Sequence, residues 1–123
     1  MASLIVMTGQ QECDYYSLGK RTNVIGRDEA LPIQILDERI SRKHLKIRYD
    51  SDKDTYTACD MNSKHGVFVN SEKISDETAL RDDAIITIGS TSLIFTLKDF
   101  ANKEDASTHY KKVGEKFRGT VQE

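Results

Sequence analysis

The chain contains many short runs of β-branched, aliphatic and aromatic residues, and glycine or polar residues separate each run from the next. Leu45–Tyr49 alternates apolar with basic residues, and Ile33–Ile35 shows the same period of two, which is typical of half-buried strands. Ile85–Gly89 and Leu93–Leu97 predict a hairpin. Because no helical pattern of about ten residues interrupts these runs before Phe100, we predict an all-β fold, an antiparallel sandwich or barrel.

The segment after residue 98 follows a different period. Its apolar residues recur at spacings of four, three and four, and they are Ala106, Tyr110, Val113 and Phe117. This spacing places them along one face of a helix, and Asn102 is a suitable N-cap. We therefore expect a β domain over residues 1–98 and a tail over residues 99–123, helical from about 102 to 118.

Size and charge limit the classes of function. At 123 residues the chain is long enough for one domain with one core. Its net charge of −2 argues against a general binder of nucleic acid or of acidic membranes, which usually has a basic domain. Cys13 and Cys59 are the only cysteines and lack metal-ligand spacing, so we expect no metal and no other cofactor. The first residues lack the basic and long apolar segments of a signal peptide, so we expect a cytoplasmic protein.

Three short polar segments, here called the three islands, follow β-rich runs between Gly26 and Asn70. They are Gly26-Arg27, Ser41–His44 and Asn62–Asn70. Loops at strand ends are where a rigid scaffold usually carries its function. The cations and hydroxyls in and beside the islands are Arg27, Arg39, Ser41, Arg42, Lys43, Ser63, Lys64 and His65. If these loops converge, they form an anion site that suits phosphate, because guanidinium donates two parallel hydrogen bonds to its oxygens.

In order and spacing, the islands resemble the motifs of the forkhead-associated (FHA) domain family. The matching patterns are Gly26-Arg27, Ser41-x-x-His44 and Ser63-x-x-Gly66-x-Phe68-Val69-Asn70, and the resemblance covers roughly residues 3 to 98. The family is a β-sandwich whose loops at one end bind phosphothreonine peptides. The resemblance therefore implies a non-enzymatic adaptor that binds phosphothreonine-containing proteins, downstream of a Ser/Thr protein kinase.

The resemblance also implies roles for individual residues. Arg27 and Ser41 contact the phosphate, and Arg42 supports it. His44 is a hydrogen-bonding brace between neighbouring loops; an alternative is a nucleophile pair of Ser41 and His44, but no nucleophile elbow or third triad member accompanies them. Gly26 meets a backbone requirement, either a positive φ angle or a close approach of two chain segments.

Gly66 and Asn70 belong to the structural support of the same site. Between Ser63 and Gly66 the chain departs from the family, because Lys64 and His65 stand where the family commonly has threonine and asparagine. Imidazole lacks the donor and acceptor geometry of an amide, so we expect phosphopeptide binding to persist with an altered grip on the peptide backbone. His65 also predicts an affinity that rises as the imidazole protonates.

Two further interpretations stay open at this point. Arg39 lies on the loop that in this family often reads the third residue after the phosphothreonine, so an acidic residue is expected there; a solvated loop charge is the alternative. The departure at Lys64-His65 and the amphipathic tail suggest a second class of function. In this class the chain is a phospho-independent scaffold or regulatory subunit that binds through the sandwich surface or the C-terminal helix.

Overall fold

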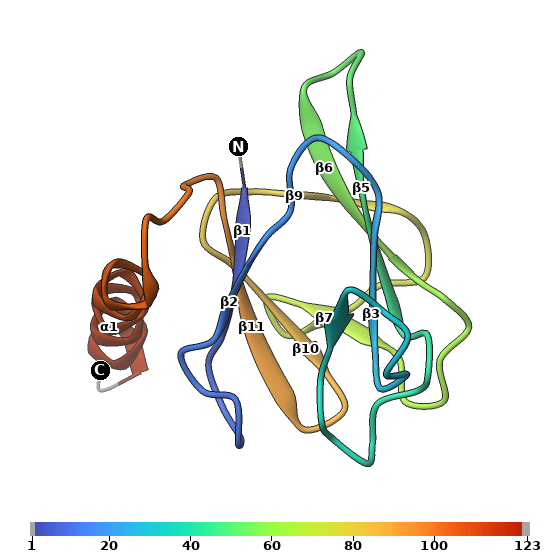
Figure 1. Cartoon of the computed structure of the whole chain (residues 1–123), viewed down its shortest axis with the longest axis horizontal. Coiled ribbons are helices and arrows are strands. Elements are labelled where there is room, and N and C mark those ends of the chain that lie inside the picture. Colours follow the sequence, from blue (N-terminus) through green and yellow to red (C-terminus); the bar gives the residue numbers. More distant parts are fainter. Residues whose placement is uncertain (1, 122–123) are drawn as a thin grey trace.

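The computed structural model describes residues 2–121, and the side chains of residues 2–113. The first sheet consists of β1 (Ser3–Val6), β2 (Tyr15–Ser17), β7 (Val67–Val69), β8 (Glu72–Lys73), β10 (Ala84–Ile88) and β11 (Thr91–Thr96). The second consists of β3 (Asn23–Gly26), β4 (Ile33–Gln34), β5 (Leu45–Asp50), β6 (Thr55–Asp60) and β9 (Thr78–Leu80). The strand orders are β2-β1-β11-β10-β7-β8 and β4-β3-β5-β6-β9. Figure 1 shows the two sheets as a sandwich, which confirms the predicted all-β fold.

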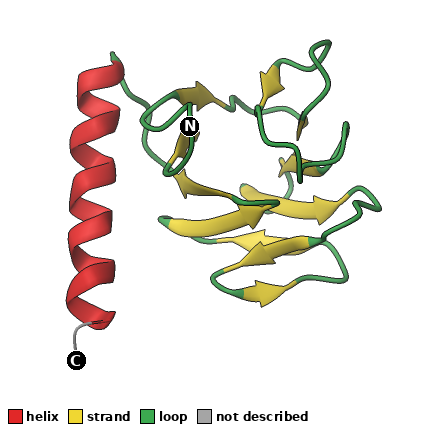
Figure 2. Ribbon diagram, turned by 90° about the horizontal axis from the view of Figure 1, so that it is seen from below, coloured by secondary structure: helices red, strands yellow, loops and turns green. Residues whose placement is uncertain are grey.

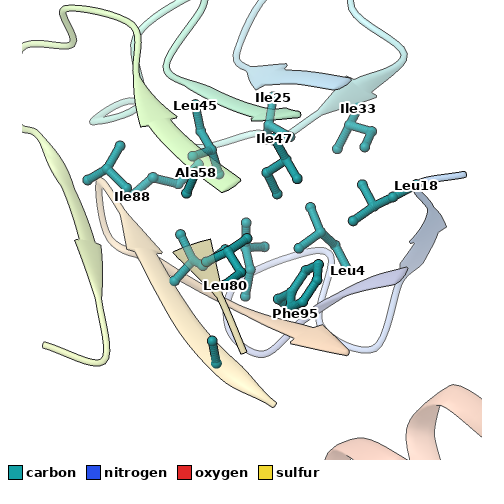
Figure 3. Packing of buried hydrophobic residues seen from close by; sticks show 14 of the residues in the cluster. Leu4, Leu18, Ile25, Ile33, Leu45, Ile47, Ala58, Leu80, Ile88 and Phe95 are labelled. Atoms are coloured by element: carbon teal, nitrogen blue, oxygen red, sulfur yellow. The ribbon is translucent and has the colours of Figure 1, made fainter. Parts of the chain in front are cut away.

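The core lies between the two sheets. Leu4 of β1 and Phe95 of β11 face Ile25 and Ile47 of the opposite sheet (Figure 3), and all four are fully buried. Along β5 buried and half-buried residues alternate over the first four positions, as the sequence period predicted. Burial of each such side chain contributes about 1.5–3 kcal/mol, which makes this layer the main source of stability.

Three features of the sheets differ from the sequence expectation. The short strands β8 and β9 were not predicted, because two or three mostly exposed residues carry no readable period. They form because the backbone of a neighbouring strand pairs with them: β8 pairs with β7, and β9 pairs with β6. The pair β3–β4 is parallel, whereas every other described pair is antiparallel. Such pairings depend on tertiary neighbours more than on local propensity.

The tail forms the helix α1 (Lys103–Val121), which begins one residue later and ends three residues later than predicted. Asn102 caps it, since its side-chain oxygen accepts a 2.9 Å hydrogen bond from the backbone N–H of Asp105. The helix stands beside the strands (Figure 2), and Ala106 and Val113 are buried against Ile5 and Ile94 of the first sheet. The side chain of Phe117 lies outside the described residues. In the part of the chain described, no helix is both long and apolar enough to cross a membrane.

Polar contacts also hold α1 against the sandwich. His109 is 8% exposed, and its Nε2 atom lies 2.7 Å from Oδ1 of Asp83, in the turn before β10. The hydroxyl of Tyr110 donates to the backbone oxygen of Met7 over 3.1 Å. The apolar stripe of the tail, as far as its side chains are described, therefore packs on the chain's own sheet.

The outer face of the second sheet carries an ion pair with a measurable pH dependence. Nε and Nη2 of Arg48 donate to Glu77 over 2.8 and 3.0 Å, and the hydroxyl of Thr57 adds a 2.8 Å hydrogen bond. The hydrogen bonds from Arg48 and Thr57 lower the pKa of Glu77 from 4.5 to about 2. A lowered carboxyl pKa stabilises the fold above the unfolded-state pKa, and this contribution is lost as the pH falls through the folded-state value.

We predict that Glu77→Gln lowers the free energy of unfolding at neutral pH by a small amount, because the pair is exposed. The difference from the wild-type chain should shrink as the pH falls from 4.5 towards 2, the two pKa values of Glu77. Urea unfolding at about pH 6 and about pH 3 measures both differences. A difference that stays the same at both pH values would show that the ion pair does not contribute.

Candidate functional site

Strand pairing brings the three islands to one end of the sandwich. In the second sheet Ile25 lies opposite Leu45, and Leu45 lies opposite Asp60. The end of β3, the start of β5 and the end of β6 therefore share one edge, and the β5–β6 turn lies at the other end (Figure 1). The loops after β3, before β5 and after β6 converge at this edge.

Gly26 allows two of these loops to touch. The backbone N–H groups of Arg27 and Asp28 donate to the backbone oxygens of Ser41 and Arg42 over 3.1 and 3.2 Å. A Cβ atom on Gly26 would lie only 2.0 Å from the carbonyl oxygen of Arg42. Of the two backbone requirements considered for this glycine, the structure shows the close approach of chain to chain.

Arg27 and Ser41 lie beside each other in this contact. Nε of Arg27 donates a 3.0 Å hydrogen bond to the backbone oxygen of Ile40, which orients the exposed guanidinium group. Ile40 itself is buried at 1% exposure, so the oxygen that receives this bond belongs to a residue anchored in the core. Ser41 is half-buried, and its hydroxyl oxygen accepts a 3.1 Å hydrogen bond from the backbone N–H of Lys64. Among the described residues, no hydrogen bond engages the terminal nitrogens of Arg27 or the hydroxyl hydrogen of Ser41, which leaves them to an anion.

His44 is fully buried and connects two of the islands. Its Nδ1 atom accepts a 3.0 Å hydrogen bond from the backbone N–H of Ser41. Its Nε2 atom therefore carries the hydrogen and donates to the backbone oxygen of Gly66 over 2.7 Å. Both ring nitrogens are occupied, so neither is placed to activate the hydroxyl of Ser41, and the geometry is that of a brace.

The third island turns tightly around its own hydrogen bonds. The backbone N–H of Ser63 donates to Asp60 over 2.9 Å, and that of Gly66 donates to the Ser63 hydroxyl over 2.9 Å. Gly66 has a φ of +84°, a conformation that side-chain-bearing residues rarely adopt. Lys64 and His65 are exposed at the tip of this turn. The Ser63 hydroxyl, grouped from the sequence with the anion-binding candidates, thus accepts a hydrogen bond within its own loop.

Asn70 lies at the end of β7 that is remote from Gly66. It has a φ of 49°, and its side chain accepts a 2.9 Å hydrogen bond from the backbone N–H of Ile85. The backbone N–H of Asn70 donates in return to the oxygen of Ile85 over 2.8 Å. Asn70 therefore holds β7 in register with β10, and any support it lends to the loops acts through β7.

Asp37 is a supporting residue that the sequence reading missed. Its carboxylate accepts 2.8 Å hydrogen bonds from the backbone N–H of Arg39, from the Thr91 hydroxyl and from the backbone N–H of Ser90. Burial alone would raise the pKa of Asp37, but these hydrogen bonds and the charge of Arg39 lower it below its usual value. The ionised group ties the loop before Ser41 to the β10–β11 turn.

Gly89, in that turn, was missed as well. It has a φ of +57°, and a Cβ atom there would lie 2.8 Å from Cγ1 of Ile40. The spacing of Asp37 and Arg39 is that of an Asx-turn, which was a readable local signal. The residues that bind the Asp37 carboxylate from the other loop, Ser90 and Thr91, are more than fifty positions away, and no local pattern indicates them.

The electrostatics of this edge favour an anion. Exposed cations from all three loops gather there, namely Arg27, Arg39, Arg42, Lys43, Lys64. Among the residues described, none of these five forms an ion pair with a carboxylate. A cluster of unpaired cations with hydroxyl and amide donors nearby is suited to a phosphate group.

A two-sheet sandwich with this cluster on its end loops is the architecture of a phosphate-recognising binding module. The FHA domain model matches residues 23–89, more than half of the chain, and the protein belongs to the FHA domain family. It is 33% identical over 79 residues to FhaA of Mycobacterium tuberculosis, a match that spans 64% of this chain and 14% of that relative.

Solved structures agree with this assignment. An FHA domain studied for phosphothreonine-dependent interactions is 28% identical, with a TM-score of 0.70 over 80% of this chain and 98% of that one. The FHA domain of FhaA, complexed with the intracellular domain of Rv3910, is 29% identical, with a TM-score of 0.68 over 77% and 99% of the two chains. The FHA domain of the CT664 protein from Chlamydia trachomatis is 27% identical, with a TM-score of 0.72 over 81% and 98%.

Proposed function

We propose that this domain binds phosphothreonine-containing proteins and acts as a non-enzymatic adaptor in Ser/Thr kinase signalling. FHA domains are phosphothreonine-binding modules. The observation that carries the proposal is the contact between the first two islands. The Arg27 guanidinium is bound through Nε to the backbone oxygen of Ile40, the residue before Ser41, and within the described chain the terminal nitrogens of Arg27 and the Ser41 hydroxyl hydrogen form no hydrogen bond.

The chemistry of the ligand matches these groups. A phosphothreonine carries a charge of about −1.5 to −2 at neutral pH and three strong acceptor oxygens. The terminal nitrogens of Arg27 suit two of these oxygens, and the Ser41 hydroxyl suits the third. Arg42 and Lys64 add positive charge at the rim, and His65 stands where the peptide backbone would pass.

The same geometry supports a binding role over a catalytic one. Both nitrogens of His44 are engaged in hydrogen bonds to the backbone, so His44 is not placed to act as a general base for Ser41. A cytoplasmic location fits the solved complex of the FhaA domain, whose partner is an intracellular domain. We therefore propose that this chain acts in the cytoplasm, where its kinase-phosphorylated partners would also be found.

Binding to an oriented phosphothreonine peptide library tests the proposal. The best peptide should bind, and its unphosphorylated form should lose most of the affinity. If no phosphothreonine peptide binds, the proposal fails.

The same library tests the role of Arg39. We expect an acidic preference at the third residue after the phosphothreonine, and an apolar preference there would leave Arg39 as a solvated loop charge.

The alternative, a phospho-independent scaffold, finds less support in the helix. The described part of the apolar stripe is packed on the first sheet, with Ala106 fully buried and Val113 at 8% exposure. Up to Val113, this face of α1 is therefore not free to take a partner helix. Undiminished binding of a cellular partner after Arg27→Ala would support the alternative through another surface.

We predict that His65 makes phosphopeptide affinity depend on pH. A protonated imidazole beside the phosphate attracts its negative charge and strengthens binding. Protonation of the phosphate, which has a pKa of about 6, weakens binding in every variant. The ratio of wild-type to His65→Gln affinity removes the phosphate's own titration. This ratio should rise by roughly two- to five-fold between about pH 8 and about pH 5.5, as measured by calorimetry. A constant ratio would remove His65 from the site.

A further inference from the structure

Lys73 lies on β8, at the edge of the first sheet and opposite Phe68 of β7. Its side chain reaches Gly66, the residue of the third island that directly precedes β7. A Cβ atom placed on Gly66 would lie 2.7 Å from Cε of Lys73 and 3.5 Å from its Nζ. The alkyl chain of Lys73 therefore covers the backbone of Gly66, and its ammonium group ends beside the loop that carries Lys64 and His65.

Lys73 has acidic neighbours but, among the described residues, is in salt-bridge contact with none of them. Glu72 and Asp76 line the same groove, yet within the described part of the chain Lys73 forms no ion pair. The groove has a volume of about 490 Å³ and also contains Ile74 and Val69. A lysine that forms no ion pair with the described residues and lies over a glycine of the binding loop is available to an external anion.

Lys73 is within reach of a peptide whose phosphate is bound at Ser41. The Ser41 hydroxyl lies 3.1 Å from the backbone nitrogen of Lys64. Gly66 follows two residues later, at most about 7 Å along the chain. An extended peptide advances about 3.3–3.6 Å per residue, so roughly two to four residues cover the path from the phosphate to Lys73.

In the first sheet, Lys73 and the turn that holds the loop of Arg39 lie on opposite sides of β7. Asp37 holds the loop of Arg39 at the β10–β11 turn. In the order β11-β10-β7-β8, Lys73 belongs to the far strand, beyond the β7 strand that follows Gly66. A peptide that crosses the loops would meet Arg39 on one flank of its phosphothreonine and Lys73 on the other.

We propose that Lys73 forms a second anion subsite, which takes a carboxylate or a second phosphoryl group two to four residues from the phosphothreonine, on the flank that Arg39 does not read. This inference rests on the proposed phosphothreonine binding and adds a preference in the ligand. It predicts that the natural partner carries an acidic residue or a second phosphorylated residue at that position.

Three sets of phosphothreonine peptides test the subsite, with asparagine, aspartate or phosphoserine scanned over both flanks. Dissociation constants are measured by fluorescence anisotropy for the wild-type chain, Lys73→Met, Arg39→Met and Lys53→Met. Lys53 is an exposed lysine in the β5–β6 turn at the opposite end of the domain, and it serves as the matched control. The neutral asparagine peptides report the phosphothreonine site alone.

On the flank that Arg39 does not read, aspartate at one position should improve wild-type binding by about two- to five-fold and phosphoserine there by about ten-fold. Lys73→Met should abolish both gains and leave neutral-peptide affinity within about two-fold of wild type, whereas Arg39→Met and Lys53→Met should keep the gains. A gain with aspartate alone identifies a carboxylate subsite, and one with phosphoserine alone a phosphoryl subsite.

On the flank that Arg39 does not read, gains that survive in Lys73→Met, or no gain at any position while the neutral peptides bind, would overturn the subsite and leave the proposed function standing. Failure of every wild-type measurement, neutral peptides included, would overturn the proposed function and the subsite with it. The neutral peptides therefore separate the two failures.

Discussion

Arg27→Ala is expected to weaken the binding of a phosphothreonine peptide by about 100-fold or more. The change removes two charge-assisted hydrogen bonds, each of which contributes about 1.5–3 kcal/mol, and about 1.4 kcal/mol corresponds to ten-fold in affinity. It also removes the 3.0 Å anchor from Nε to the Ile40 oxygen. Isothermal titration calorimetry measures the loss, and thermal unfolding followed by circular dichroism verifies that the domain stays folded.

Arg27→Lys is the matched variant for this prediction. It keeps the charge but lacks the planar fork, so its affinity should lie between those of the wild-type chain and Arg27→Ala. Ser41→Ala should cost about ten-fold, because it removes one hydrogen bond to a charged oxygen. Wild-type affinity in a folded Arg27→Ala domain would place the phosphate elsewhere and refute the proposed site.

Gly26→Ala is expected to have the largest effect on stability, a loss of about 3 kcal/mol or more in the free energy of unfolding. The added Cβ would lie 2.0 Å from the backbone oxygen of Arg42. Backbone atoms cannot move aside as a flexible side chain does, so the loop before β5 must separate from β3. The hydrogen bonds from the N–H groups of Arg27 and Asp28 would then be strained or broken.

Gly9→Ala is the contrasting variant, because it adds backbone strain without a close contact, whereas Gly26 has a close contact and no positive φ. Gly9 has a φ of +87°, but no atom lies within 4 Å of its added Cβ. This substitution should cost only about 1 kcal/mol, from backbone strain, and should leave phosphopeptide binding unchanged. Urea unfolding compares the two variants, and peptide titration of folded Gly26→Ala should show weaker binding. Equal losses of stability would mean that the approach at Gly26 is not tight.

The sequence predicts those parts of the fold that depend on residues close together in the chain. The alternation of Leu45–Tyr49 predicts β5, which the structure contains. The position of Asn102 before the helical pattern predicts an N-cap, and its side chain accepts the hydrogen bond from the backbone N–H of Asp105. The strands β8 and β9 could not be predicted from the sequence, because each forms by pairing with a neighbouring strand of its sheet. Glu72 and Lys73 are both exposed, and nothing in a polar pair indicates a strand.

The candidate site divides in the same way. The identities of Arg27, Ser41 and His44 were readable as a motif, since phosphate chemistry requires particular donors at particular points of the chain. The partners of these residues were not. Ser41 accepts a hydrogen bond from Lys64, and His44 binds Gly66, in each case more than twenty positions along the chain. The contacts of Asp37 with Ser90 and of Lys73 with Gly66 are likewise absent from any local pattern.

The sequence by itself determined the class of fold, the three islands and the kind of ligand they suit, because strand periods and donor types are properties of neighbouring residues. Only the tertiary structure decided which of the cations are unpaired, that Gly26 serves a close approach, and that His44 connects Ser41 to Gly66. Such contacts join residues that are remote in the chain, and they exist only once the two sheets have packed and brought their end loops together.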